Sequence, residues 1–153
     1  MKVNIYTHTT ARGPKKKITG FGYVLECETA KGPATLSHIG HFENETKNRS
    51  ELKALAEALK QLNRPCELEI YTTPYMAAVI ETWLPSWEAH GWKNSRGEEI
   101  DLEYRELKNL LKPHSVSLKT DAHSFTEWLT RETKKEEKEG CSTNTGNLIR
   151  QKK

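Results

Sequence analysis

The residues of this chain best suited to metal or proton-transfer chemistry are one glutamate and two histidines. Glu51 stands in the run Asn-Arg-Ser-Glu-Leu at residues 48–52, where a helical pattern begins, and its carboxylate is the kind of ligand that Mg²⁺ prefers. His8 ends an alternating segment and His123 precedes the last helical pattern. An imidazole can move a proton near neutral pH or bind a softer metal. What these groups can do depends on the elements that position them.

The segment from residue 2 to about Phe42 reads as three strands. Val3, Ile5 and Thr7 alternate with polar neighbours, which predicts a strand over residues 2–8. A basic turn follows, and further strand patterns pass through residues 21–25 and end near Phe42. Short connections between these segments favour an antiparallel meander.

The periodicity changes at Asn48. Leu52, Leu55 and Leu59 share one helical face, and the helix is expected to end before Pro65. The next segment, 68–72, is a strand pattern. A strand that follows a helix in this way implies a right-handed crossover and a parallel neighbour in the sheet.

The second half predicts further helices and one more strand. Short helices are expected over about 75–83 and 102–111, then a strand through Val116 and Leu118. A capping box, Ser124 to Glu127, opens a last helix. The fold class is therefore mixed α/β, a five-stranded mixed sheet flanked by helices, in a domain of residues 1–133. Residues 134–153 are charged and aperiodic and are expected to form a disordered tail.

Two sequence motifs carry a family resemblance. Residues 48–52 resemble the Asn-Arg-x-Glu-Leu run of ribonuclease H, and Trp83, Trp87 and the Gly-Trp-Lys of residues 91–93 resemble the segment with which bacterial members grip DNA. The order of predicted elements agrees with that fold from about residue 2 to 133. The resemblance implies a ribonuclease H-like fold and cleavage of the RNA strand of RNA–DNA hybrids with two metal ions held by four carboxylates.

The resemblance also implies which positions form the site, and most of its carboxylates are missing here. The family's first aspartate falls on His8, its glutamate on Glu51, its next aspartate on Thr72 and its last carboxylate, loosely, on Glu127. The family's mobile catalytic histidine corresponds to His123 with a one-residue slip. Only Glu51 matches closely, so it is the candidate metal ligand, and Mg²⁺ or Mn²⁺ is expected only if the enzyme is active.

Other interpretations of these residues stay open. Glu51 could be a first-turn glutamate that interacts with the helix dipole. His8 could be a hydrogen-bonded histidine at a strand end, or it could join Glu51 and His123 in a nitrogen-rich Mn²⁺ or Zn²⁺ site.

Candidate nucleic-acid contacts lie in loops and at the start of the first helix. The lysines offer phosphate contacts, as does Arg12 in the same turn, and the tryptophan lies in a loop where it could contact a strand. The resemblance implies that the asparagine reads the minor groove of the hybrid, as the matching asparagine of the family does. The set is Asn48, Lys15, Lys16, Lys17, Trp92 and Lys93. Trp83 and Trp87, at helical spacing, are expected to pack inside the protein.

Composition sets loose limits on the class of protein. A net charge of +3 permits nucleic-acid binding without requiring it. Three cysteines without a CxxC pair argue against a disulfide framework or zinc site and favour a reducing cytoplasm. No apolar run reaches membrane-spanning length, and the first residues read as a strand rather than a signal peptide, so no membrane partner is expected.

The sequence favours a degenerate ribonuclease H-like protein of bacterial or mobile-element type. It would bind RNA–DNA hybrid or another duplex, with cleavage lost or weak. One alternative is an active metal-dependent ribonuclease H with a rebuilt site that uses His8, Glu51 and Glu127. Another is a protein-interaction module that retains only the fold.

Overall fold

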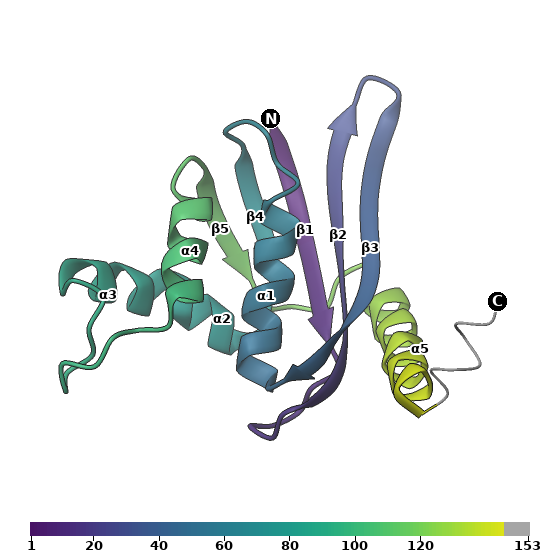
Figure 1. Cartoon of the computed structure of the whole chain (residues 1–153). Helices are drawn as coiled ribbons and strands as arrows, with labels where there is room; N and C mark the ends of the chain where they lie inside the picture. The colour runs from purple at the N-terminus through teal and green to yellow at the C-terminus, as the bar shows by residue number, and fades with distance from the viewer. Residues whose placement is uncertain (146–153) are drawn as a thin grey trace.

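A single mixed sheet organises the molecule. The computed structural model describes residues 1–145. The sheet has the strand order β3-β2-β1-β4-β5 (Figure 1). Its strands are β1 Lys2–Thr9, β2 Lys17–Thr29, β3 Gly32–Glu45, β4 Glu67–Tyr71 and β5 Ser115–Lys119. The first three strands pair antiparallel, and β4 pairs parallel with both β1 and β5. The predicted five-stranded mixed sheet is confirmed, including the parallel contact between β1 and β4.

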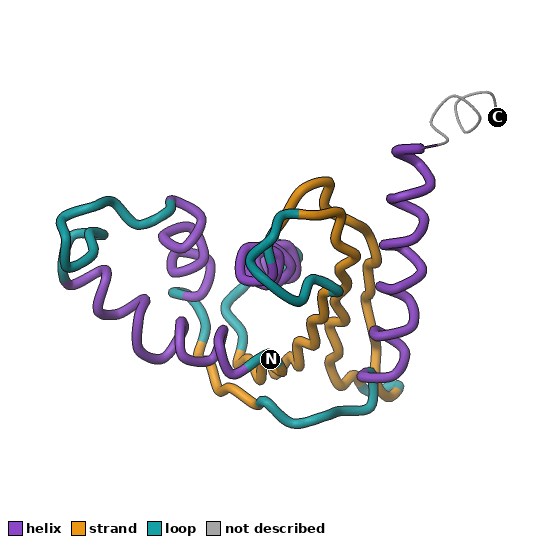
Figure 2. Tube along the Cα trace, turned by 90° about the horizontal axis from the view of Figure 1, so that it is seen from below, coloured by secondary structure: helices purple, strands orange, loops and turns teal. Residues whose placement is uncertain are grey.

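Helices cover both faces of this sheet. They are α1 Lys47–Leu59, α2 Pro74–Ala78, the π-helical η1 Val79–Trp83, α3 Leu84–Ala89, α4 Leu102–Leu111 and α5 Thr126–Thr145. Figure 2 shows α1 nearly end-on against one face and α5 running along the other. No helix in this described part combines the length and the apolar character that crossing a membrane requires.

Two hydrophobic clusters follow from the alternation of β1. Ile5 is fully buried on the α1 face, where it packs with Leu55 and Ile70 in the main core. Tyr6, one residue on, points to the α5 face and packs with Leu129. Burying one such aliphatic side chain contributes about 1.5–3 kcal/mol, so both faces hold β1 in place.

The helical run after β4 contains a π turn. The sequence predicts one helix over about 75–83, but the helical backbone continues through α2, η1 and α3 to Ala89. Pro85 lies in the first turn of α3 and cannot donate to a carbonyl in the preceding turn. A wider turn at η1 is a common way to relieve that conflict.

The last helix corrects the prediction of a disordered tail. α5 continues to Thr145, so that prediction is wrong for residues 134–145, while residues 146–153 lie outside the described part. Glycines let the helix lie close to the sheet: a Cβ on Gly20 would lie 2.0 Å from the carbonyl oxygen of Thr133. The Ser124–Glu127 capping box is not formed, because no hydrogen bond joins these two residues in the structure.

Candidate active site and nucleic-acid interface

The predicted site residues of β1, α1 and β4 meet at the end of the sheet where the carboxyl ends of β1 and β4 lie. Tyr6 pairs with Tyr71 in the parallel register, so the carboxyl ends of β1 and β4 lie side by side. Glu51 reaches this end of the sheet from α1, where the hydroxyl of Thr73 donates a 2.8 Å hydrogen bond to its Oε2. His8 lies close enough that the charge of Glu51 acts on its pKa. The expected convergence of His8, Glu51 and the end of β4 is confirmed.

Both oxygens of the Glu51 carboxylate have partners within the protein. Glu51 is 7% exposed, and its Oε1 accepts from Lys47 Nζ at 2.8 Å while Oε2 accepts from Thr73 Oγ1 at 2.8 Å. Glu51 lies beyond the first turn of α1, so its interpretation as a first-turn glutamate is wrong.

Lys47 and Thr73 were missed by the sequence analysis, although each carries a signal. Lys47 and Glu51 are spaced i, i+4 on a helix, which places their side chains together. Thr73 precedes Pro74 and caps α2 by accepting from the amide of Met76 at 3.2 Å. A threonine-proline pair after a strand is thus a helix start, and the cap hydroxyl also faces Glu51.

His8 and Thr72 supply no negative charge where the resemblance implies aspartates. Burial lowers the pKa of His8, and the nearby Glu51 carboxylate only partly opposes this. His8 is therefore neutral at pH 7, and its ring makes no hydrogen bond to any residue of the described chain. The amide of Thr72 donates to the carbonyl of Lys119 at 3.0 Å, and its side-chain hydroxyl forms no hydrogen bond with the described residues.

His123 lies in the loop between β5 and α5, where its ring packs in an aromatic cluster. Its ring centroid lies 4.5 Å from that of Tyr6 and 5.4 Å from that of Tyr71. Its Nδ1 accepts from the amide of Phe125 at 3.1 Å. Burial lowers the pKa of His123, and proximity to His8 lowers it further, so this imidazole is also neutral at pH 7. The ring is a packing element of the α5 face.

Glu127 is not brought into contact with Glu51. It is exposed in the first turn of α5 and makes neither a hydrogen bond nor an ion pair with the described residues. The structure therefore places one buried carboxylate, Glu51, at the position of the predicted cluster.

The donor set does not fit two Mg²⁺ ions. Mg²⁺ needs charged oxygen ligands in near-octahedral geometry, and here the single carboxylate has both oxygens engaged. Within residues 1–145, no group of three or more His, Cys, Asp or Glu side chains is arranged to hold a metal ion. The same finding removes the predicted nitrogen-rich site of His8, Glu51 and His123.

Comparison with known proteins agrees with the fold. The sequence profile of RNase H matches residues 1–126. The chain belongs to the ribonuclease H family. A ribonuclease H of Cupriavidus necator is 36% identical over 120 residues, which cover 76% of this chain and 79% of the relative. A ribonuclease H of Caldicellulosiruptor saccharolyticus is 43% identical over 91 residues, 56% of this chain and 62% of the relative.

Solved structures share the fold at lower sequence identity. LC9-RNase H1, described as a type 1 RNase H with the type 2 active-site motif, has a TM-score of 0.71 at 19% identity and covers 85% of this chain and 69% of its own. The foamy viral protease-reverse transcriptase in complex with RNA/DNA hybrid has a TM-score of 0.62 at 14% identity. The aligned region covers 86% of this chain and 18% of the viral chain.

In this member of the ribonuclease H family, a basic turn packs against the start of α1. The amide of Lys47 donates to the carbonyl of Gly13 at 3.0 Å. A hollow of about 280 Å³ lies at this contact, lined by Gly13, Pro14, Thr46, Lys47 and Asn48. Asn48 is exposed, and its side chain makes no hydrogen bond to the described residues. This amide is therefore available to a ligand in the hollow.

The lysines of the turn differ in availability. Lys15 and Lys16 are exposed and have no ion-pair partner among residues 1–145. Lys17 pairs with Glu137 of α5 at 2.8 Å, which offsets its charge. The sequence predicts the same role for all three lysines, but in the structure Lys17 differs because α5 extends far enough for Glu137 to reach it.

The prediction that Trp92 contacts nucleic acid from a loop is wrong. Trp92 is only 9% exposed, belongs to the main core, and carries the guanidinium of Arg105 over its ring at 5.8 Å. Its left-handed backbone, with φ of 63°, turns the chain so that the ring points inward. Trp83 was expected to pack inside, yet it is 41% exposed. Lys93, which follows Trp92, is exposed.

The two basic loops do not form one continuous cluster. Figures 1 and 2 both place the turn between β1 and β2 apart from the loop that joins α3 to α4 and contains Lys93. Trp92 anchors the second loop, and the amide of Ile100 donates to its carbonyl at 2.9 Å. A ligand that used both would have to be extended.

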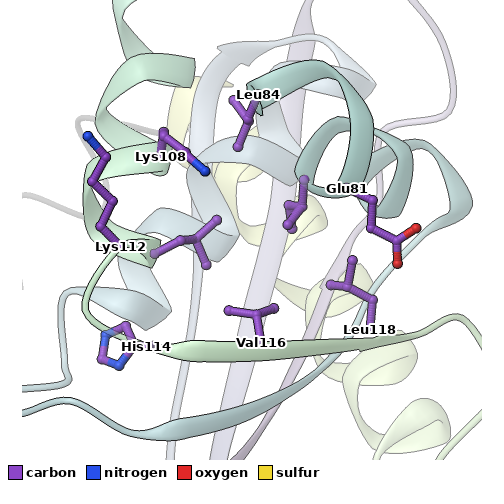
Figure 3. A pocket seen from close by; sticks show the side chains of 9 residues that line it. Glu81, Leu84, Lys108, Lys112, His114, Val116 and Leu118 are labelled. Carbon is purple, nitrogen blue, oxygen red and sulfur yellow. The ribbon is translucent and has the colours of Figure 1, made fainter. Parts of the chain in front are cut away.

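A further hollow lies beside the edge strand and contains none of the predicted site residues. It measures about 370 Å³ and lies between β5, α4 and the η1–α3 turn. Figure 3 shows Val116 and Leu118 of β5 below it and Lys108 of α4 above it. It is separate from the Glu51 position.

Proposed function

We propose that this protein binds RNA–DNA hybrid, or another nucleic-acid duplex, and that it does not cut the strand through two Mg²⁺ ions. One observation carries the proposal: the Glu51 carboxylate is satisfied by Lys47 and Thr73, and within residues 1–145 it joins no group of three or more side chains that could hold a metal ion. A two-metal site needs several negative charges to hold its ions and to stabilise the charge that develops in the transition state. Here His8 and Thr72 replace two of the carboxylates, and the charge of the third, Glu51, is offset by Lys47.

The same substitutions favour binding without a metal. A cluster of free carboxylates repels a phosphate backbone unless cations neutralise it. In this chain His8 and Thr72 are uncharged, and Glu51 forms an ion pair with Lys47 at 2.8 Å. A strand can therefore lie across this end of the sheet with little repulsion. The imidazole and hydroxyl groups can donate hydrogen bonds to its oxygens.

The cations around the site supply the attraction. Lys15 and Lys16 lie in the turn beside α1, and Lys93 lies on the separate loop. Asn48 opens onto the hollow between that turn and α1. Phosphate contacts from such lysines give affinity that depends on salt and little on base sequence. The family supports this ligand class, because a structural neighbour, the foamy viral enzyme, is described in complex with RNA/DNA hybrid.

The bound strand would meet no group prepared to activate water. His8 is neutral but makes no hydrogen bond to a carboxylate that would orient it. His123 is packed against Tyr6 and Tyr71, and Glu127 makes no hydrogen bond or ion pair with the residues that the structure describes. The residues bind and orient the strand, and the hydrolytic step lacks its charge cluster.

A binding titration with and without divalent ions tests this proposal. Labelled hybrid is titrated with the protein at low salt in EDTA and in Mg²⁺, at matched ionic strength. The dissociation constants are expected to agree within about twofold, because no metal is needed to neutralise the site. Absence of low-salt affinity for hybrid, duplex RNA and duplex DNA would end the binding proposal. The interaction-module alternative would then lead.

A further inference from the structure

A third hollow lies between the carboxyl end of β1 and α5. Its volume is about 420 Å³, large enough for a nucleotide unit. It is lined by His8, Thr9, Thr10, Ala11, Arg12, Lys17, Thr130, Lys134 and Glu137. Part of its wall comes from residues beyond 133, which the sequence analysis assigned to a tail.

The charges that face this hollow are unbalanced. Lys17 and Glu137 form an ion pair at 2.8 Å and offset each other. Arg12 and Lys134 are both exposed, and neither makes an ion pair or a side-chain hydrogen bond within the described chain. His8 is neutral at pH 7 because burial lowers its pKa. Two cations on different elements therefore face one hollow without a carboxylate of their own.

The walls of the hollow are held in place before any ligand binds. The amide of Thr10 donates to the carbonyl of Gly20 at 2.9 Å, and the amide of Gly20 donates to Thr10 Oγ1 at 3.0 Å. Ala11 is buried. Across the hollow, Thr133 is fully buried and lies against Gly20, which fixes α5 on the sheet. Fixed walls reduce the ordering cost of binding.

The segment of residues 9–14 joins this hollow to the one beside α1. Residues 9–12 line the α5 side, and Gly13 and Pro14 line the hollow that contains Lys47 and Asn48. A chain of phosphates that crossed this segment would meet Arg12 and Lys134 on the α5 side and the side-chain amide of Asn48 on the α1 side, where Lys47 is paired with Glu51. A free small anion would gain from one side only, so the arrangement fits a polyanion.

We infer that the hollow between β1 and α5 binds a phosphate of the nucleic-acid strand that crosses residues 9–14, with Arg12 and Lys134 as its cationic contacts. This inference rests on the proposed function. It extends the interface past the Glu51 position to a hollow where Arg12 and Lys17, both offered by the sequence as phosphate contacts, meet Lys134 of α5. It also gives the last helix a binding role.

The test compares two charge-matched double variants of the full chain. Arg12→Gln with Lys134→Gln removes both proposed contacts. Arg64→Gln with Lys135→Gln removes the same charge elsewhere: Lys135 neighbours Lys134 on α5 but pairs with Glu132, and Arg64 lies past the far end of α1. Hybrid affinity is measured between 50 and 300 mM salt for each protein. Thermal melting confirms that each variant is folded.

The expected result is a change of slope confined to the first variant. Each lost phosphate contact reduces the slope of log affinity against log salt by about 0.7–0.9, so the Arg12/Lys134 variant should lose about 1.4–1.8. The Arg64/Lys135 control should keep the wild-type slope. Equal slopes in both variants, with a wild type that binds hybrid, overturn the inference and leave the proposed function standing. A wild type without nucleic-acid affinity overturns both.

Discussion

The two sides of the carboxyl end of β1 use charge in opposite ways. On the α1 side, Glu51 is buried and its two oxygens are taken by Lys47 and Thr73. On the α5 side, Arg12 and Lys134 face a hollow and have no partner within the described residues. Charges that satisfy each other stabilise the fold and cannot hold an ion. Charges left facing outward attract a polyanion, so the comparison points to binding without two-metal cleavage.

Restoring carboxylates on the α1 side should give the largest change. His8→Asp with Thr72→Asp adds negative charge beside Glu51 at the positions that the family resemblance marks. We expect Mg²⁺-dependent hybrid cleavage to rise by a factor on the order of a thousand over the wild type. Single-turnover cleavage of labelled hybrid measures the gain. The same variant should bind hybrid more weakly in EDTA than in Mg²⁺, since uncompensated carboxylates repel phosphate.

The control for this gain removes Glu51 from the double variant. Adding Glu51→Gln should abolish the new cleavage, because the site would again lack a carboxylate from α1. A double variant that is folded, and gains neither Mg²⁺-dependent binding nor cleavage, would show that the backbone geometry no longer suits metal ligands.

The exposed lysines of the two basic loops should control the salt dependence of nucleic-acid binding. Lys15→Gln, Lys16→Gln and Lys93→Gln together should reduce the log–log salt slope by about 2–3, at 0.7–0.9 per contact. Fluorescence anisotropy with labelled hybrid measures the slope. The melting temperature should be nearly unchanged, because exposed charges contribute little to stability. An unchanged slope would exclude these lysines from the interface.

Thr73 links the site to the fold and should affect stability. Thr73→Val removes the hydroxyl that donates to Glu51 and caps α2. Loss of the cap and an unpaired carboxylate oxygen should cost about 1–3 kcal/mol of unfolding free energy. Urea denaturation measures this loss, and Thr73→Ser, which keeps the hydroxyl, serves as the control. Equal stability of the Val and Ser variants would contradict the importance of the contact.

The partly buried His8 should make the fold sensitive to acid. The pKa of His8 is lowered from its ordinary value of 6.5, so the unfolded chain binds a proton more readily than the folded one. Stability associated with His8 is therefore present above about pH 6.5 and is lost as pH falls toward the lowered pKa. His8→Gln should reduce the fall in melting temperature between pH 7 and pH 5.

His41 should respond in the opposite direction. Its pKa is raised, chiefly by the hydrogen bond between its Nδ1 and Glu136 at 2.7 Å. That contribution is fully present below pH 6.5 and is lost as pH rises through the raised pKa. A His41→Gln variant should keep the acid sensitivity caused by His8, and this separates the two histidines. An acid response unchanged by His8→Gln would contradict its burial as the cause.

The sequence predicted the scaffold better than the contacts within it. Periodicity placed the strands and α1 because alternation and helical spacing report which side of an element is buried. The Lys47 and Thr73 partners of Glu51 were missed since they depend on how α1 packs beside the end of β4. Trp92 looked like a loop residue, but its positive φ turns the ring into the core.

The last helix shows the same limit. Its composition beyond residue 133 is charged, which is typical of disorder, yet glycines on the facing strand allow α5 to lie against β2. The decisive residue, Gly20, is over a hundred positions away in sequence, so local composition could not reveal the contact. The hollow lined by Arg12 and Lys134 was hidden for the same reason.

One measurement tests the central claim most directly. An excess of wild-type protein is incubated with end-labelled RNA–DNA hybrid in Mg²⁺ at low salt, and the same samples are run on native and denaturing gels. The account predicts that the hybrid is shifted on the native gel and intact on the denaturing gel. Robust cutting by the wild type that disappears in Glu51→Gln would contradict it, because Glu51 would then hold a catalytic metal despite its bonds to Lys47 and Thr73.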